Sequence, residues 1–383
     1  MRSYKFKLSP SKAIQTKFEQ TLNLCGELYN AALQERREAW KLNRISINFY
    51  LQAVQLPEIK LIRTELGNIY SQVLQDVLRR LSKTFDNFFR RVKQGDAKVG
   101  FPRFKSRSRF DSFCYVQSGF KIVGDKLILS KIGSVKLKLH RAIEGTIKTC
   151  TIKRESNGWY VIFACETESQ PQIKTIQSAV GVDVGLETFG TLSNGEKITN
   201  PRFFKIDEKA LGKANRRLSD EQKGTKQFKK RVKVLQKIYR RIRNRRTNFA
   251  HQESRKLVNS FDAIFFEDLN ITKMMQNGFL AKGIADVAWH QLISFTLYKA
   301  ENAGKVCKTV NPKGTSQECS GCGEIVKKDL SVRIHHCLNC GLKICRDVNA
   351  SLNILGRGLA TLGNQSIKAA SKRVFGGGVI TMS

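Results

Sequence analysis

Two cysteine pairs near the carboxyl end constrain the fold of this chain more than any other feature of its sequence. Cys319 and Cys322 form one C-x2-C pair, and Cys337 and Cys340 form a second pair after fourteen intervening residues. Each pair presents two thiolates to one ion, so together they predict a tetrahedral four-sulfur zinc site. Such a site has no open coordination position, which indicates a structural ion and not a catalytic one. Three nearby residues could substitute as ligands: His335, His336 and Cys345.

Two apolar segments each carry a carboxylate where a buried strand is expected. Residues 179–184, AVGVDV, predict a strand containing Asp183, and residues 261–269, FDAIFFEDL, predict a strand ending near Glu267. A lone buried carboxylate is costly unless a cation receives it. Asp347, in CRDVNASLNIL, is expected at the start of a short helix, where capping alone could explain it.

If these three carboxylates converge from separate elements, they require a counter-charge. Mg²⁺ or Mn²⁺, held by hard oxygen ligands, provides it. Two such ions can activate water and stabilise the leaving oxygen in phosphodiester cleavage, so the acids predict a metal-dependent nuclease site.

The chain is strongly basic. Its 68 Lys and Arg against 32 Asp and Glu give a formal net charge of +36 over 383 residues. This excess predicts a polyanionic partner, with nucleic acid favoured over an anionic membrane surface because the basic residues are spread along the whole chain. The first residues show no apolar signal region, and no segment reaches the about 18 apolar residues of a membrane span. We therefore expect a soluble cytoplasmic protein.

The remaining sequence predicts a mixture of helices and strands. Alternating segments at 3–9 and between 111 and 166 predict a small antiparallel barrel, into which a helical region at 12–92 would be inserted. Residues 209–246 hold 16 Lys and Arg against 2 acids and predict a basic helical region, suited to phosphate contact or simply solvated. A helix is expected at about 287–302 and a further strand at 305–310.

Several motifs, in this order, resemble those of one known family. GVDVGLETFGTLSNG, FFEDLNI, the cysteine pairs and CRDVNASLNI follow the order of a RuvC-like, RNase H-fold nuclease interrupted by a zinc ribbon. Together with YKFKLSPSKAIQ, SQVLQDVLRRLSKTFDNFFRRVKQG and VGFPRFKSR, they resemble TnpB, the OrfB family of insertion-sequence proteins related to type V CRISPR effectors.

The resemblance implies an α+β multidomain fold. An RNase H-like (RuvC) α/β nuclease domain would carry an inserted zinc ribbon, and an amino-terminal β-barrel wedge domain would carry an inserted helical recognition domain. The expected boundaries are 1–10 and 97–170 for the wedge, 11–96 for the recognition domain, 174–311 and 345–358 for the nuclease domain, 312–344 for the ribbon and 359–383 for a flexible tail.

The resemblance also implies an RNA-guided DNA endonuclease of a mobile element. A guide RNA from the element's end would direct a nucleoid-associated, monomeric protein to cut double-stranded DNA beside a short adjacent motif. The catalytic acids and magnesium ligands map onto Asp183, Glu267 and Asp347, whereas Cys345 replaces a further Asp common in the family. Three alternatives remain: an RNA-guided DNA-binding repressor that does not cut, a strand-transfer transposase, and a generic basic zinc-ribbon protein.

Contacts to nucleic acid are expected on the recognition helices, the wedge and the basic helical region. By resemblance, Gln72 and Gln75, with Tyr115, would read the adjacent motif, and glutamine can pair bidentately with adenine. The predicted phosphate contacts are Arg79, Arg80, Arg90, Arg91, Lys229, Lys230, Arg240 and Arg241.

Overall fold

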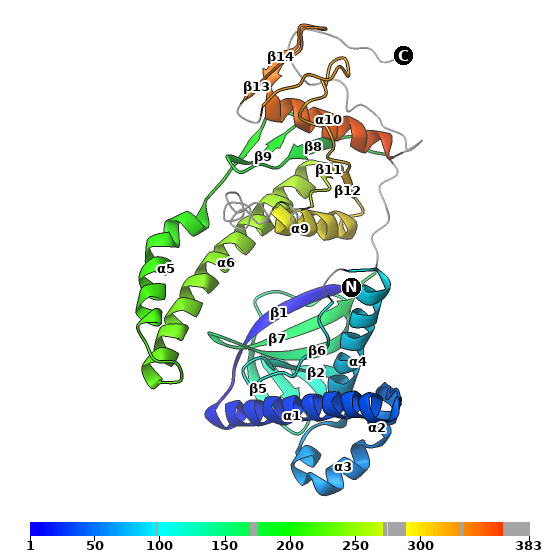
Figure 1. Ribbon diagram of the computed structural model, residues 1–383, viewed down its shortest axis with the longest axis vertical. Helices are drawn as coiled ribbons and strands as arrows, with labels where there is room; N and C mark the ends of the chain where they lie inside the picture. Colours follow the sequence, from blue (N-terminus) through cyan, green and yellow to red (C-terminus); the bar gives the residue numbers. More distant parts are fainter. Residues whose placement is uncertain (97–98, 169–174, 271–273, 275–288, 330–331, 363–383) are drawn as a thin grey trace. The chain divides into compact units, whose positions relative to one another are not determined.

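The computed structural model describes residues 1–96, 99–168, 175–270, 274, 289–329 and 332–362 (Figure 1). The chain divides into two compact units, Met1–Glu168 and Ser169–Ser383, and each is described by itself. Among the described ranges, no helix is both long and apolar enough to cross a membrane.

The first unit contains a seven-stranded antiparallel sheet that nearly closes on itself. Its strands are, in spatial order, β2 (Ser112–Val116), β6 (Thr146–Glu155), β7 (Gly158–Glu166), β1 (Arg2–Ser9), β5 (Gly133–Lys138), β4 (Lys126–Leu129) and β3 (Phe120–Val123). The two edge strands, β2 and β3, are consecutive in the chain with only residues 117–119 between them. This short link brings the two edges together and makes the sheet curl. The predicted antiparallel sheet, with strand 3–9 as a member, is confirmed.

The helices of the first unit all lie in the chain between β1 and β2. They are α1 (Lys12–Asn43), α2 (Phe49–Val54), α3 (Leu56–Ile62), a 3-10 helix (Thr64–Asn68) and α4 (Ser71–Lys93). Ser11 caps α1 by accepting a hydrogen bond from the Ile14 backbone N–H. The buried face of α4, which includes Val73, Val77 and Leu81, joins the same apolar core as the inward side chains of the sheet. The sequence did not predict α3 or the 3-10 helix, since each is too short for a helical period to be visible.

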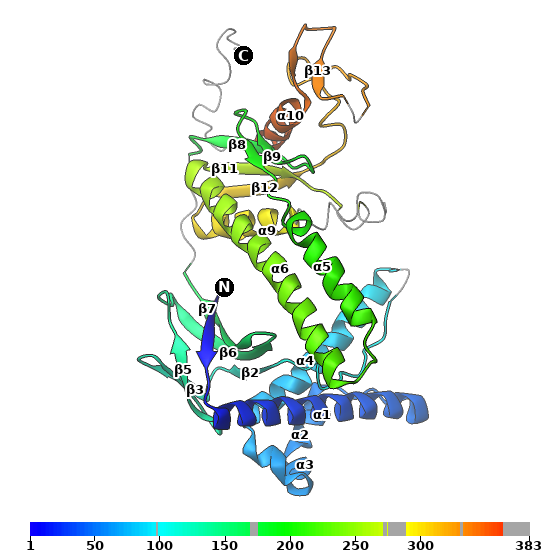
Figure 2. The same ribbon diagram turned by 90° about the vertical axis from the view of Figure 1, so that its left-hand side faces the viewer.

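The second unit is built on a mixed five-stranded sheet (Figures 1 and 2). The spatial order is β10 (Lys197–Thr199), β9 (Thr188–Leu192), β8 (Ala179–Asp183), β11 (Ala263–Glu267) and β12 (Val306–Val310). The first three strands pair antiparallel, whereas β8, β11 and β12 run parallel. This arrangement confirms the three predicted strands.

Helices cover both faces of this sheet. Phe266 of β11 packs in one core with residues of α6 (Lys226–Ser260) and α9 (Trp289–Asn302), while its neighbour Phe265 packs in another core with Ile354 of α10 (Arg346–Ala360). Strand alternation therefore directs consecutive side chains to opposite helical layers. Helix α5 (Phe203–Ser219) pairs with α6, and Asp207 accepts from Arg241 at 2.6 Å and from Arg245 at 3.2 Å. The predicted tail lies outside the described residues from 363 onward, and its residues 359–360 belong to α10.

Two glycines allow α10 to lie very close to the sheet. A Cβ on Gly181 of β8 would stand 2.1 Å from the Ser351 carbonyl oxygen, and one on Gly358 of α10 would stand 2.1 Å from the Phe265 ring. Any larger residue would push helix and strand apart. The close approach matters because α10 begins beside Asp347.

We expect Gly181→Ala to destabilise the chain by about 3 kcal/mol or more, since the added methyl meets helix backbone that cannot rotate away. Gly190→Ala, on the neighbouring strand β9, is the matched control, because its Cβ would meet Val182 Cγ1 at an ordinary 3.4 Å. Urea denaturation of the two variants measures the difference. Equal midpoints would contradict the close packing of α10.

Candidate functional site: three carboxylates beside a four-cysteine centre

Two of the predicted carboxylates end neighbouring parallel strands. Val182 pairs with Phe266 in the register of β8 and β11, so Asp183 and Glu267 follow at the same edge of the sheet. Carboxyl ends of parallel strands are a common position for binding sites, because the side chains there point beyond the sheet. Asp347, in the first turn of α10, is brought to this edge by the packing of α10 on β8.

The electrostatics show that the three acids interact. The pKa of Asp183 is raised to about 8, first by burial and then by the charges of Glu267 and Asp347, while Arg346 opposes the rise. Burial also raises the pKa of Glu267, which is 7% exposed. Burial and its two acidic neighbours therefore disfavour the ionised form of Asp183, and a divalent cation would offset these effects.

The chemistry of this donor set fits Mg²⁺ or Mn²⁺, which prefer carboxylate oxygens. Among the described residues, however, only the four cysteines gather three or more ligand atoms within 4.8 Å of one another. The three carboxylates are thus close enough for the charges of Glu267 and Asp347 to act on Asp183, but their oxygen atoms do not all lie within 4.8 Å of one another. We call Asp183, Glu267 and Asp347 the acidic cluster.

Sequence reasoning missed the direct partners of the acidic cluster. Arg346 binds Asp347 through Nη2 and Nε, both at 3.1 Å from Oδ1. The Thr315 hydroxyl donates to Glu267 Oε1 and also contacts the Pro312 carbonyl at 3.2 Å. Arg333 lies 4.0 Å from Asp347 and 2.6 Å from Glu187. Of these partners, only Arg346 could have been predicted from the sequence, because it is adjacent to Asp347.

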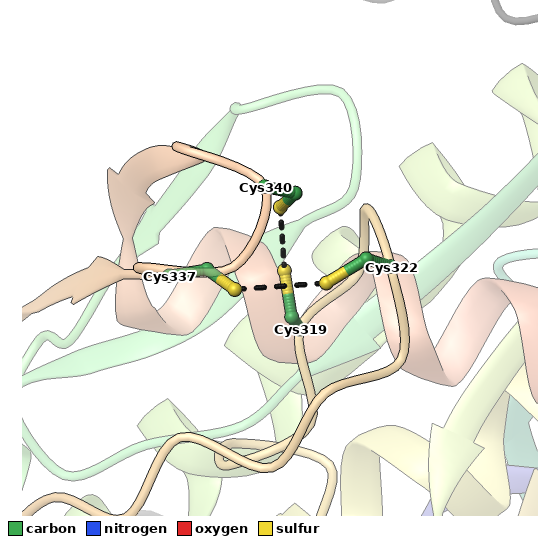
Figure 3. A group of neighbouring side chains, drawn as sticks. All are labelled: Cys319, Cys322, Cys337 and Cys340. Atoms are coloured by element: carbon green, nitrogen blue, oxygen red, sulfur yellow. Dashed lines mark hydrogen bonds between the residues drawn. The ribbon is translucent and has the colours of Figure 1, made fainter.

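The four predicted zinc ligands do come together (Figure 3). The Sγ atoms of Cys319 and Cys340 lie 3.6 Å apart, as do those of Cys322 and Cys337. Four sulfurs around one zinc ion at the usual bond length would be separated by about 3.8 Å, so the residues fit the ion. Hydrogen bonds from the Glu324 backbone N–H and from Asn339 lower the pKa of Cys322 to about 7, which favours the thiolate.

The two cysteine turns have matching backbone geometry. Cys319 N–H donates to Glu324 O and Gly323 N–H donates to Cys319 O, and the same pattern recurs around Cys337 with Gly341 as the matching glycine. Gly323 and Gly341 have φ of 78° and 73°, a conformation that favours glycine. His335 is fully buried and contacts Lys328 Nζ through Nδ1, outside the sulfur cluster. Cys345 ends β14 (Lys343–Cys345), opposite Ile334 of β13 (Ile334–His336).

Two asparagines of α10 bind the first cysteine turn. Asn349, fully buried, donates to Glu318 O at 2.7 Å and accepts from Ser320 N–H at 2.9 Å. Asn353 donates to the carbonyls of Thr315 and Glu318 at 2.8 and 2.7 Å. The segment that holds the cysteines therefore also positions Thr315 against Glu267, and it is fastened to the helix that carries Asp347.

The predicted nucleic-acid contacts lie in different environments. Tyr115 is 1% exposed and donates to the Ser130 carbonyl at 2.9 Å, so contact with DNA would require it to leave this packing. Arg80 is paired with Asp76 at 2.6 Å and with the Ser112 carbonyl at 2.8 Å. Gln72 and Gln75 are partly buried, and Arg240 is also partly buried. The following are exposed: Arg79, Arg90, Arg91, Lys229, Lys230 and Arg241.

Comparison with known proteins identifies the family. The OrfB_IS605 family model, described as "Probable transposase", matches residues 162–278, and the "Cas12f1-like, TNB domain" model matches residues 289–354. A "Putative RNA-guided DNA endonuclease" of Streptomyces pristinaespiralis is 33% identical over 370 residues, covering 94% of this chain and 90% of its own. This chain belongs to the TnpB (OrfB) family.

Other relatives agree with this membership. The "Putative RNA-guided DNA endonuclease InsQ" of Escherichia coli strain K12 is 28% identical over 382 residues. The match covers 94% of this chain and 93% of InsQ. The cryo-EM structure of a Cas12f1–sgRNA–target DNA complex matches this TnpB-family chain with a TM-score of 0.59 at 16% identity, over 90% of this chain and 83% of that one. The mixed α/β fold is therefore similar to that of Cas12 effectors. The HTH_OrfB_IS605 model, described as a helix-turn-helix domain, matches residues 1–44, which here form β1 and the single helix α1.

Proposed function

We propose that this TnpB-family protein is an RNA-guided DNA endonuclease of a mobile element, cutting double-stranded DNA beside a short adjacent motif. The observation that carries the proposal is the meeting of Asp183, Glu267 and Asp347 at one edge of the sheet. Carboxylates grouped in this way can hold the metal ions that hydrolyse a phosphodiester, whereas binding of nucleic acid alone gives no reason for them.

The proposal assigns a role to each domain, and the fold supports these assignments. The strand order β10-β9-β8-β11-β12, with three antiparallel and three parallel members sharing β8, supports a RuvC-like nuclease domain at 174–311 and 345–358. Residues 312–344 would be the zinc ribbon. The curled sheet of the first unit would act as the wedge, and the helices inserted after β1 as the recognition domain.

In the nuclease site, Asp183, Glu267 and Asp347 would hold the magnesium ions. Bound there, magnesium would lower the pKa of a water molecule and stabilise negative charge on the leaving oxygen. Thr315 would fix the orientation of Glu267 by its hydrogen bond. Arg346, which donates to Asp347 through Nη2 and Nε, would hold this carboxylate in place at the site.

The partners would be a guide RNA and the target DNA. A net charge of +36 supports binding to both strands of a heteroduplex through the backbone. Exposed basic residues on α4 and α6, such as Arg90 and Lys229, are in a position to contribute. Gln72 and Gln75 remain the proposed readers of the adjacent motif.

The test is to purify the protein with its RNA, sequence that RNA, and incubate the complex with matching duplex and Mg²⁺. We expect one discrete RNA that ends in sequence flanking the element, and cleavage of both DNA strands. Tight target binding with no nicked product would instead identify a repressor. Strand-transfer products formed without RNA would identify a transposase.

Thr315 offers a test of how Glu267 is positioned. Thr315→Val keeps the shape of the side chain but removes the donor to Glu267, and we expect cleavage to slow by about tenfold. Thr315→Ser restores the hydroxyl and should restore most of the rate. The Mn²⁺ concentration that gives half-maximal cleavage should rise in the valine variant and recover in the serine variant. If serine and valine behave alike, the hydroxyl does not position Glu267.

A further inference from the structure

A groove rich in aromatic residues lies among the helices of the first unit, and none of its lining residues is assigned above to metal. Its volume is about 840 Å³, and it is formed by the carboxyl half of α1, the middle of α4, residues 45–48 and Phe101. Its aromatic lining residues are Trp40, Phe85, Phe88, Phe89 and Phe101. We call this feature the aromatic groove.

Four phenylalanines of this groove, Phe85, Phe88, Phe89 and Phe101, form one connected surface. Phe101 meets Phe85 and Phe88 edge to face, with ring centroids 5.6 and 5.3 Å apart. Phe89 contacts Phe88 at 5.2 Å. Although the phenylalanine rings pack against one another, much of the aromatic surface stays in contact with water: Trp40, Phe89 and Phe101 are 54%, 60% and 45% exposed. Contiguous exposed aromatic surface of this kind marks a binding site, because leaving it in water is unfavourable.

The segments that form the groove are basic, while its own lining holds Arg36, Arg37 and Lys41 against Glu38 and Asp86. Segments 34–48, 79–93 and 99–109 together contain fourteen Lys and Arg against three acids. Two arginines lie over rings of the groove, with Arg36 5.3 Å from the Phe85 centroid and Arg44 5.8 Å from the Trp40 centroid. The basic segments and the exposed rings together favour an occupant that meets two conditions, a negative charge and flat apolar faces. A second copy of this chain fails the first condition, because it would bring the same positive charge.

Single-stranded nucleic acid meets both conditions. Unpaired bases stack on aromatic side chains, while basic residues follow the phosphates. Paired bases in a duplex hide these faces, so a duplex would gain only the charge interaction. Glu38 and Asp86 also line the groove, and their carboxylates disfavour phosphate inside it but can accept hydrogen bonds from amino groups on base edges.

We propose that the aromatic groove binds unpaired nucleotides of a nucleic-acid strand, with bases stacked on Trp40, Phe89 and Phe101 and phosphates held by the surrounding Lys and Arg. The inference rests on the proposed function only for the source of the strand, which would be unpaired guide RNA or DNA displaced from the target. Binding itself needs neither metal nor the acidic cluster.

Tryptophan fluorescence provides a direct readout. Of the three tryptophans, Trp159 and Trp289 are only 6% and 3% exposed, so Trp40 is the one that a stacked base can quench. The full-length protein, freed of RNA, is titrated with single strands of about ten nucleotides, either uridine RNA or thymidine DNA, and with a duplex of equal length. We expect strong quenching by single strands and little by the duplex. Tighter binding of the RNA strand would point to guide RNA, and tighter binding of the DNA strand to the displaced strand.

Matched variants test the location. Phe89→Leu should weaken single-strand binding about five- to tenfold, the effect of losing one stacking partner. Trp40→Leu, followed by anisotropy of a labelled strand, should do the same. Tyr50→Leu is the control, because Tyr50 is 75% exposed on α2 but does not line the groove. Unchanged melting temperatures confirm that all three variants fold.

Three results would overturn the inference: equal quenching by duplex and single strand, equal affinity of Phe89→Leu and Tyr50→Leu, or quenching of Trp40 by concentration-dependent dimerisation without nucleic acid. Cleavage is assayed separately. A protein that binds single strands in the groove but never cuts would refute the proposed function and leave this inference standing. A protein that cuts normally but binds single strands elsewhere would refute this inference and leave the proposed function standing.

Discussion

Replacing Asp183 with asparagine is expected to slow cleavage of guide-matched DNA by at least about a thousandfold, because the variant keeps the shape of the side chain but loses a metal-binding charge. The affinity for RNA should stay within about twofold, because a single carboxylate, whose charge repels phosphate, contributes little to binding. The measurement is a single-turnover cleavage time course with the purified RNA complex, together with RNA affinity at fixed salt.

The acidic residue next to the cluster supplies the control. Asp268 directly follows Glu267 but is exposed, beyond the end of β11. Asp268→Asn makes the same change of charge within a few residues of the site and should cut at nearly the original rate. If Asp183→Asn cut as fast as Asp268→Asn, the acidic cluster would not be the nuclease site.

Removal of zinc is expected to have the largest effect on stability. A structural zinc ion bound by four thiolates contributes on the order of 10 kcal/mol to folding of the segment around it. Cys337→Ser removes a buried ligand and should abolish stoichiometric zinc binding. Asn349 and Asn353 fasten the first cysteine turn to α10, so loosening of the turn should also lower the melting temperature of the unit that carries Asp347.

Elemental analysis and thermal melting measure these effects. Cys345→Ser is the matched control, because it makes the same chemical change outside the sulfur cluster. It should keep one zinc per chain, which would also exclude Cys345 as a substitute ligand. The original protein without zinc, or Cys337→Ser with full zinc content, would contradict the four-cysteine centre.

The positions of the acids were predictable, but their surroundings were not. Asp183 and Glu267 stand out because each interrupts an apolar strand, which is a local pattern that strand period makes visible. The hydroxyl of Thr315, by contrast, reaches Glu267 across 48 residues of chain. Asn349 lies only two residues after Asp347 in the sequence, yet its side chain binds the cysteine turn.

The aromatic groove shows the same limit. The Phe and Arg residues of α4 are visible in the sequence, which predicted a helical region at 12–92 with arginines that contact phosphate. Nothing local indicates that Phe101, from the segment after α4, would lie against Phe85 and Phe88, or that Trp40 of α1 would line the same groove.

The amino-acid sequence by itself determined the four cysteines that come together, the strands that end in carboxylates, the nearly closed antiparallel sheet and the basic character that favours a nucleic-acid partner. Each of these depends on residue type and on spacing over a few residues. Only the tertiary structure decided which helix approaches β8 through Gly181, which arginine pairs with Asp347 and which aromatic rings meet in one groove. These features arise where distant segments pack, and close packing depends on the shapes of all the side chains at once.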